Sequence, residues 1–123
     1  MNVSIKGFFS PSCETRELNV DPELRTRYYR NNFNQVIEGL NKLAEKHHLE
    51  VREVNVRHKE VYLLGNGYDC IVTISQMNPI ESGVDFKLNF FSTIGFYRPK
   101  KKVLQFYKDL KGILKFKGVS LHP

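Results

Sequence analysis

The chain has 123 residues, of which 41% are apolar and 26% are charged. This composition is typical of a globular domain and argues against a disordered chain. The length suits one hydrophobic core, so we expect residues 1–123 to form a single domain. The longest apolar run covers only a few residues, which predicts that no segment crosses a membrane.

The positive charge is concentrated at the C-terminal end. Residues 98–123 hold eight Lys and Arg side chains and one acidic one, Asp109, so this segment carries +7 while the whole chain carries +6. A concentrated positive field attracts anions in a way that scattered charge does not. The basic residues of the segment are Arg98, Lys100, Lys101, Lys102, Lys108, Lys111, Lys115 and Lys117.

Two cysteines, Cys13 and Cys70, are far apart in the sequence and form no CxxC pair. No secretory segment opens the chain, and together these features favour a reducing, cytoplasmic setting. Cys70 falls on the apolar side of a predicted strand and is expected in the core. Cys13 falls in a predicted loop without an activating His or Arg motif, so we expect an inert thiol, with a reactive thiol as the alternative.

The first third of the chain predicts a strand, a loop and a helix. Apolar and polar residues alternate over 2–9, as in a strand, and turn-forming residues follow over 10–15. Asp21-Pro22 is a typical helix start. Apolar side chains then recur at three- and four-residue steps from Tyr29 to Ala44, and His47-His48 closes the helix, with a break near residues 30–32.

The middle third predicts an antiparallel meander. Asn66-Gly67 lies between two apolar runs, and a two-residue turn there pairs Leu63 with Cys70 on one apolar face. Continued backwards, this register would bury basic side chains. We therefore expect a bulge or turn near residues 57–60, with Val54 and Val56 pointing inward. After turn residues near 78–83, a strand with one buried and one wet face follows over 84–91.

The last element is an amphipathic helix that starts after Arg98-Pro99 and stops at Gly118. Its apolar side chains fall within one arc, and Lys101, Lys108 and Lys115 fall on the opposite side, with Lys111 close by. The segment 119–121 either adds a short strand or trails off. The elements predict an α+β fold of the two-layer sandwich type. Its antiparallel sheet of 4–5 strands carries two helices on one face, in the order β-α-β-β-β-α, with an extra strand or bulge near 57–60.

The portion from about residue 31 to 116 resembles double-stranded-RNA-binding domains in its α-β-β-β-α order. Lys100-Lys101-Lys102 is similar in position to the lysines that open the second helix of those domains. The alanine-rich second helix and the glycine-bearing loop before it are absent here, so the resemblance is one of topology, which says little about function.

These features favour a small non-enzymatic binding or adaptor domain that engages an acidic protein surface through the basic helix. The alternative is an RNA- or DNA-binding domain that uses the same lysines to neutralise phosphates, with Phe91 and Tyr97 as stacking aromatics. A plain solvated helix face is the competing structural interpretation. The expected binding residues are Arg98, Lys100, Lys101, Lys102, Lys108, Lys111 and Lys115.

The polar face of the sheet is a second candidate surface, for a ligand or another subunit, although such faces commonly just meet water. No cofactor, metal site or catalytic residue is expected. His47 and His48 are adjacent and diverge on a helix, so they cannot chelate one ion. Gly65-Asn66-Gly67 lies between strands and has no helix behind it, unlike a phosphate-binding loop. The sequence leaves the partner and the oligomeric state open.

Overall fold

The computed structural model of the protein describes residues 12–92 and 98–120. Along the chain these residues form β1 (Ser12–Glu14), the short 3-10 helix η1 (Pro22–Leu24), β2 (Arg27–Tyr29), α2 (Phe33–His47), β3 (Glu50–Asn55), β4 (Glu60–Leu64), β5 (Tyr68–Asn78), β6 (Glu81–Phe90), α3 (Pro99–Ile113) and β7 (Phe116–Val119).

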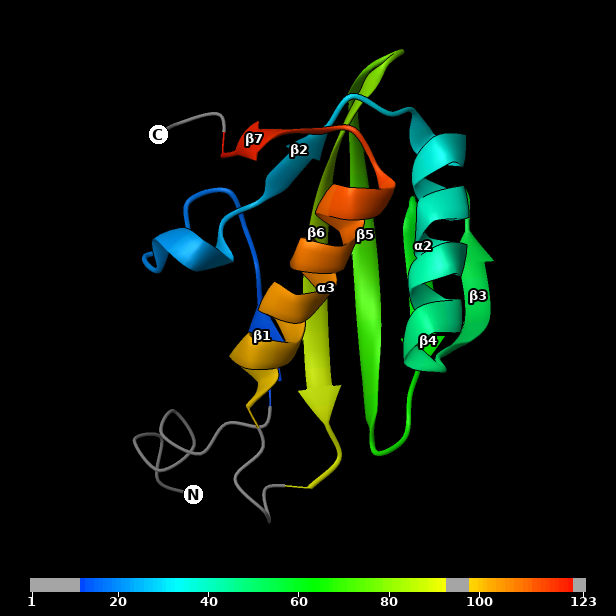
Figure 1. The fold of residues 1–123 in the computed structure, drawn as a ribbon, viewed down its shortest axis with the longest axis vertical. Coiled ribbons are helices and arrows are strands. Elements are labelled where there is room, and N and C mark those ends of the chain that lie inside the picture. The colour runs from blue at the N-terminus through cyan, green and yellow to red at the C-terminus, as the bar shows by residue number, and fades with distance from the viewer. Residues whose placement is uncertain (1–11, 93–97, 121–123) are drawn as a thin grey trace.

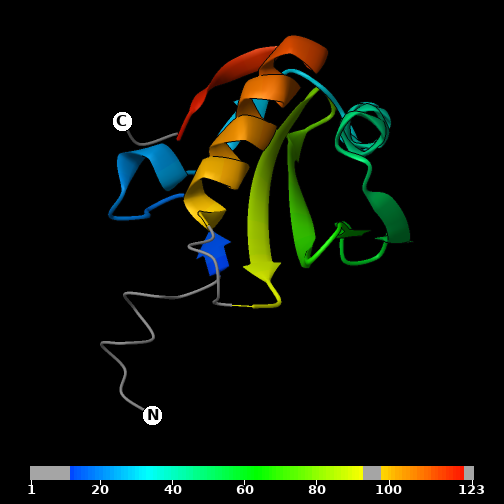
Figure 2. The ribbon, with the colours of Figure 1, turned by 60° about the horizontal axis from the view of Figure 1, so that its bottom comes forward.

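The fold is α+β, as predicted, with one antiparallel sheet. The strands run in the order β3-β4-β5-β6-β2-β7, and β1 also pairs with β6. Both helices lie on the same side of this sheet, α2 near its β3 end and α3 across β6 and β1 (Figures 1 and 2). The described sheet has seven strands rather than the predicted 4–5, because β1, β2 and β7 are too short to show a clear alternation in the sequence.

The N-terminal third differs most from its prediction. The strand predicted over residues 2–9 lies outside the described residues. The loop predicted over 10–15 is wrong in part, since Ser12–Glu14 forms β1 and pairs with residues 87–89 of β6. The exposed backbone edge of β6 supplies hydrogen-bonding partners there, and this long-range pairing outweighs the local preference of Pro and Ser for a turn.

The helix predicted from Asp21-Pro22 onward begins later. The Asp21 carboxylate does accept a hydrogen bond from the Glu23 amide, but only the single turn η1 follows. The chain then forms β2, in which Tyr29 is fully buried. The helix α2 starts at Phe33, where Asn32 and Gln35 form a reciprocal capping box, and it ends near His47-His48 as predicted.

The hairpin between β4 and β5 confirms its prediction. Leu63 pairs with Cys70, and the Gly65 amide donates to the Tyr68 carbonyl oxygen at 2.8 Å across the turn. Only Gly67 of the two turn residues has a positive φ, of 84°, which fits a residue without a side chain.

The predicted interruption near residues 57–60 is a four-residue turn between β3 and β4. The prediction that Val54 and Val56 point inward is not confirmed. Val54 pairs with the core residue Val61, yet it is 38% exposed, because β3 is the edge strand. Val56 lies in the turn and is 63% exposed.

The C-terminal helix α3 starts at Pro99, as predicted, but ends at Ile113 rather than at Gly118. Asn31 and Arg30 capture the backbone of Lys115: its amide donates to Asn31 Oδ1 at 2.8 Å, and its carbonyl oxygen accepts from the Arg30 amide at 2.7 Å. This redirects the chain into β7, which pairs with β2. Four strands separate α2 from α3, so the order shared with double-stranded-RNA-binding domains is not the one found.

The core lies between the sheet and the two helices. The apolar patterns of α2, β6 and α3 predict eight core residues, of which Phe90 is only partly buried. The other seven are buried: Phe33, Val36, Leu40, Phe86, Leu88, Phe106 and Leu110. The ring of Phe86 lies at the centre, with its centroid 4.9 Å from that of Tyr107 and 5.6 Å from that of Phe106.

A cluster of polar side chains lies where β6 stops pairing with β1 and begins pairing with β2. The alternation over residues 84–91 predicts Asp85 on the wet face of its strand. Asp85 is instead half-buried and accepts hydrogen bonds from the hydroxyls of Thr15 and Thr26. Desolvation by burial raises the pKa of Asp85, while the two threonine hydroxyls oppose this shift. The Tyr107 hydroxyl donates to the Val84 carbonyl oxygen at 2.7 Å and lies 2.9 Å from Thr15 Oγ1. These bonds tie α3 to β6 and to the residue that follows β1.

Asp109 of α3 holds the two helices together. Its carboxylate binds the Lys46 ammonium at 2.9 Å and the His47 ring nitrogen at 2.7 Å, both from α2. The hydrogen bond from Lys46 lowers the pKa of Asp109; desolvation by burial opposes this shift, and the hydrogen bond from His47 adds to the lowering. The only acidic side chain of the C-terminal segment is thus turned toward α2.

We expect Asp109→Asn to lower the free energy of unfolding by about 0.5–1 kcal/mol at neutral pH, because it removes the ion pair with Lys46. The loss is small because the Lys46 side chain is exposed and water screens the pair. The folded-state pKa of Asp109 is below its ordinary value of about 3.9. The pair therefore stabilises the fold above that pH, and this contribution is lost as the pH falls through the folded-state pKa. Urea unfolding at a series of pH values tests this, with the exposed Glu45→Gln of α2 as the control. Identical pH profiles for wild type and Asp109→Asn would contradict the prediction.

Candidate binding surface

The basic residues of the C-terminal segment fall into three groups by their surroundings. The first group is neutralised within the fold. Lys100 binds Asp21 at 2.8 Å and Glu23 at 3.0 Å, both at η1, and Lys117 binds Glu81 at 2.8 Å. The expected binding role of Lys100 therefore conflicts with its structural one, since its charge already has two partners.

The second group covers aromatic rings. The Lys102 ammonium lies 5.3 Å from the ring centroid of Tyr68, and that of Lys111 lies 5.0 Å from the ring centroid of Phe116. Such positions are favourable because the face of an aromatic ring attracts a cation. Both side chains therefore pack against the domain instead of extending freely into solvent.

The side chains of the third group have no ion-pair partner among the described residues. Arg98, Lys101, Lys108 and Lys115 are exposed, and none of them forms an ion pair within residues 12–92 and 98–120. We call these four residues the α3 basic surface. Three lie on or next to α3, and Lys115 follows its end. Lys101, Lys108 and Lys115 of the predicted stripe are all in this group. Lys111 is in the second group, and Lys100, another expected binding residue, is in the first.

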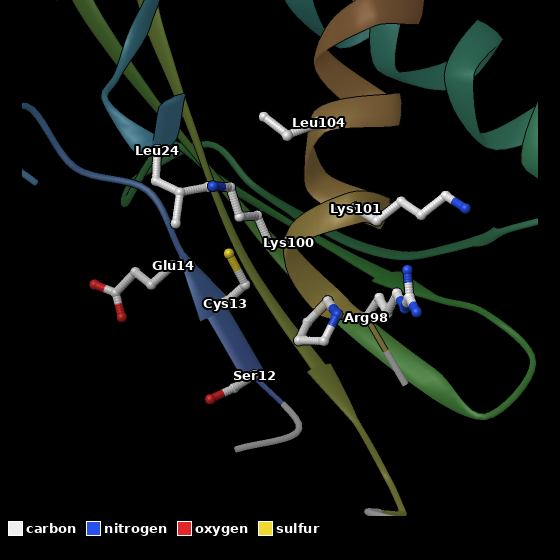
Figure 3. Close-up of a pocket in the computed structure, with 9 residues that line it drawn as sticks. Ser12, Cys13, Glu14, Leu24, Arg98, Lys100, Lys101 and Leu104 are labelled. Carbon is white, nitrogen blue, oxygen red and sulfur yellow. The ribbon is translucent and has the colours of Figure 1, made fainter. Parts of the chain in front are cut away.

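A hollow of about 680 Å³ lies beside the first turn of α3, between β1, η1 and the helix. Its walls are mainly apolar and come from Cys13, Leu24, Pro99 and Leu104, with Arg98 and Lys101 also lining it. Figure 3 shows the Cys13 sulfur pointing into this space, while the side chains of Arg98 and Lys101 extend together to the side away from Cys13. We call it the apolar hollow.

A second hollow, of about 300 Å³, lies on the other flank of the same helix turn, beside the β4–β5 turn. It is lined by Arg98, Lys101 and Lys102, by the amide side chains of Asn66 and Gln105, and by Tyr68 and Phe90. No carboxylate lines it among the described residues. We call it the cationic hollow. Arg98 and Lys101 line both hollows, and so lie between an apolar and a cationic recess.

Cys13 has the environment of an unreactive thiol. Its side chain is 9% exposed, and burial raises the pKa of the thiol to about 11, with Asp21 adding to the shift and Lys100 opposing it. A thiol with this pKa holds almost no thiolate, the nucleophilic form, at neutral pH. Cys70, which the sequence predicts in the core, is fully buried.

The two aromatic residues considered for base stacking differ in status. Phe91 is 58% exposed, so its ring is accessible, whereas Tyr97 lies outside the described residues. Among the rings that lie next to these cations, that of Tyr68 lines the cationic hollow, but Tyr68 is only 6% exposed and is covered by Lys102. A base could not stack on Tyr68 without displacing Lys102.

The polar face of the sheet offers a weaker site. A shallow hollow of about 220 Å³ lies there, with Tyr62, Ile71 and Glu60 in its lining. Within the described part of the chain, no group of three or more His, Cys, Asp or Glu side chains could hold a metal ion. Over the same residues, no helix is long and apolar enough to cross a membrane.

The sequence did not predict the residues that shape the two hollows. Leu24, Leu104, Asn66 and Gln105 carry no motif, and they come together only through the packing of α3 against η1 and the β4–β5 turn. No known protein-family model matches the chain, and no curated protein matches its sequence.

Proposed function

We propose that this domain is a non-enzymatic adaptor that binds an acidic protein surface through the α3 basic surface. The observation that carries the proposal is that Arg98, Lys101, Lys108 and Lys115 are exposed without ion-pair partners in the described chain, while Asp109 is engaged by α2. Other cations of the same segment are neutralised by Asp21, Glu23 and Glu81. Unpaired cations on and beside one helix create a positive field that steers an acidic partner.

Two observations favour a protein over a nucleic acid as the partner. Arg98 is the only arginine in the basic segment, although arginine is the usual side chain for bidentate contacts to phosphate. The mainly apolar hollow next to Arg98 and Lys101 also suits a protein side chain better than a sugar-phosphate backbone. Nucleic-acid binding through the same lysines is the competing outcome of the test below.

The test is the triple variant Lys101→Glu, Lys108→Glu and Lys115→Glu, measured with fluorescent polyglutamate as the acidic probe. We expect the variant to keep the wild-type melting temperature, because exposed and unpaired lysines contribute little to stability, and to lose polyglutamate binding. The matched control is Lys42→Glu, Arg57→Glu and Lys87→Glu. These exposed residues lie on other surfaces, and both sets of changes bring the net charge from +6 to zero.

Equal binding by wild type and both triple variants would show that the α3 basic surface is only a solvated helix face. Titration with duplex RNA and duplex DNA separates the two classes of partner. Binding to a duplex that persists near physiological salt would favour the nucleic-acid function, whereas binding that vanishes there supports the adaptor, because non-specific contacts to phosphates are strongly salt-dependent.

A further inference from the structure

The apolar hollow and the cationic hollow lie on opposite flanks of the first turns of α3, with Arg98 and Lys101 between them. A partner that offers only charge would leave the apolar hollow unused. A partner that offers only an apolar group would leave the cations unpaired. The two recesses together call for a ligand in which an apolar group and several carboxylates are close neighbours.

We infer that the partner of the α3 basic surface is a short acidic peptide segment that carries one large apolar side chain. This inference rests on the proposed function and specifies its partner. The apolar side chain enters the apolar hollow between Cys13, Leu24 and Leu104, and the adjacent carboxylates pair with Arg98, Lys101 and Lys102 across the helix turn.

The size and lining of the apolar hollow support this assignment. Its volume of about 680 Å³ falls within the range of about 300–1,000 Å³ that is usual for sites that enclose a small ligand. Leu24 and Leu104 are only partly buried, so an entering side chain gains apolar contact on both walls. Buried anchors of this kind, in pockets at the centre of an interface, provide most of the binding energy of a peptide or protein.

Charge complementarity supports the acidic character of the segment. Lys100 lines the apolar hollow, but Asp21 and Glu23 neutralise it, so its aliphatic stem is the part offered to a ligand. Arg98 and Lys101 have no such partners in the described chain and direct their charged groups to the side away from Cys13 (Figure 3). There they join Lys102 and the neutral amides of Asn66 and Gln105. Glu14 is the one acidic residue that lines the apolar hollow, and none lines the cationic hollow among the described residues.

The experiment uses two synthetic glutamate-rich peptides of equal charge, one with a central Phe and one with Ala in its place. Fluorescence anisotropy with the full chain should give an affinity at least about tenfold higher for the Phe peptide. Added salt should lower the affinity for both peptides. The ratio of the two affinities should stay almost unchanged, since screening acts on the charges and not on the apolar contact.

The protein variants locate the two contacts. Leu104→Gln should abolish the advantage of the Phe peptide and leave the affinity for the Ala peptide unchanged. Leu24→Gln, on η1, should do the same and serves as the second variant if Leu104→Gln does not fold. Lys102→Gln should lower the affinity for both peptides by the same factor, because it removes a cation without changing the apolar hollow.

The outcomes separate this inference from the function on which it rests. Equal affinity for the Phe and Ala peptides overturns the apolar anchor. In that case the adaptor function still stands if the triple lysine variant no longer binds either peptide. Failure of wild type to bind either peptide overturns the adaptor function itself. If Leu104→Gln and Leu24→Gln lower the melting temperature and change neither affinity, the hollow packs against another part of this chain, and the anchor is again overturned.

Discussion

Phe86→Ala should lower the free energy of unfolding by about 3–5 kcal/mol, the range observed when a large aromatic side chain is removed from a core. Phe86 is fully buried in β6, and its ring contacts those of Phe106 and Tyr107 on α3. Alanine would leave a cavity at the contact that joins the sheet to the helix, and the surrounding rings can fill it only in part.

Thermal and urea unfolding both measure this loss, which corresponds to a fall in melting temperature on the order of 10 °C. Phe91→Ala is the control, since that ring lies just after the same strand and is 58% exposed. We expect a change within about 0.5 kcal/mol for the control. Equal effects at the two positions would mean that Phe86 is not the centre of the core.

Tyr107→Phe should cost about 1–3 kcal/mol, although it removes a single oxygen atom. The Tyr107 hydroxyl is buried, donates to the Val84 carbonyl oxygen and contacts Thr15 Oγ1. Its loss leaves the Val84 carbonyl oxygen without this donor in a place that water does not reach. Burial also holds the pKa of the Tyr107 hydroxyl well above its ordinary value.

Urea unfolding of Tyr107→Phe and of Tyr62→Phe distinguishes a buried hydroxyl from an accessible one. Tyr62 also donates a hydrogen bond, to Asp69 at 2.8 Å, but its side chain is half-exposed and water can replace the partner. We expect Tyr62→Phe to lower the free energy of unfolding by less than about 0.5 kcal/mol. A Tyr107→Phe variant as stable as wild type would show that the bond to Val84 contributes nothing net.

The elements that the sequence predicted well are those with long periodic patterns. The apolar stripe of α2, the alternation over 84–90 and the Asn66-Gly67 turn each repeat or mark one geometry over several residues. The short strands β1, β2 and β7 could not be predicted this way. Three or four residues show too little alternation, and these strands form because their backbones find partners in β6 and in each other.

The candidate site also combines features that the sequence predicted with features that it could not predict. The exposure of Lys101 and Lys108 followed from their place on the helix relative to the buried Phe106 and Leu110. The loss of Lys100 to internal ion pairs could not be predicted, since its partners Asp21 and Glu23 are distant in sequence. The two hollows likewise depend on how η1 and the β4–β5 turn approach α3, which no local pattern encodes.

The pairing of β7 with β2 affects how the domain can fold during synthesis. Arg27 of β2 pairs with Val119 of β7 on one side and with Val84 of β6 on the other, so β2 completes its hydrogen bonds only after most of the chain has been made. Until then the backbone edge of β2 that later binds β7 has no strand beside it, and an unpaired edge invites contacts with other chains. A nascent chain released before residue 116 should therefore be more prone to aggregate than the full domain, and ribosomes that stall near that point would expose this edge to chaperones.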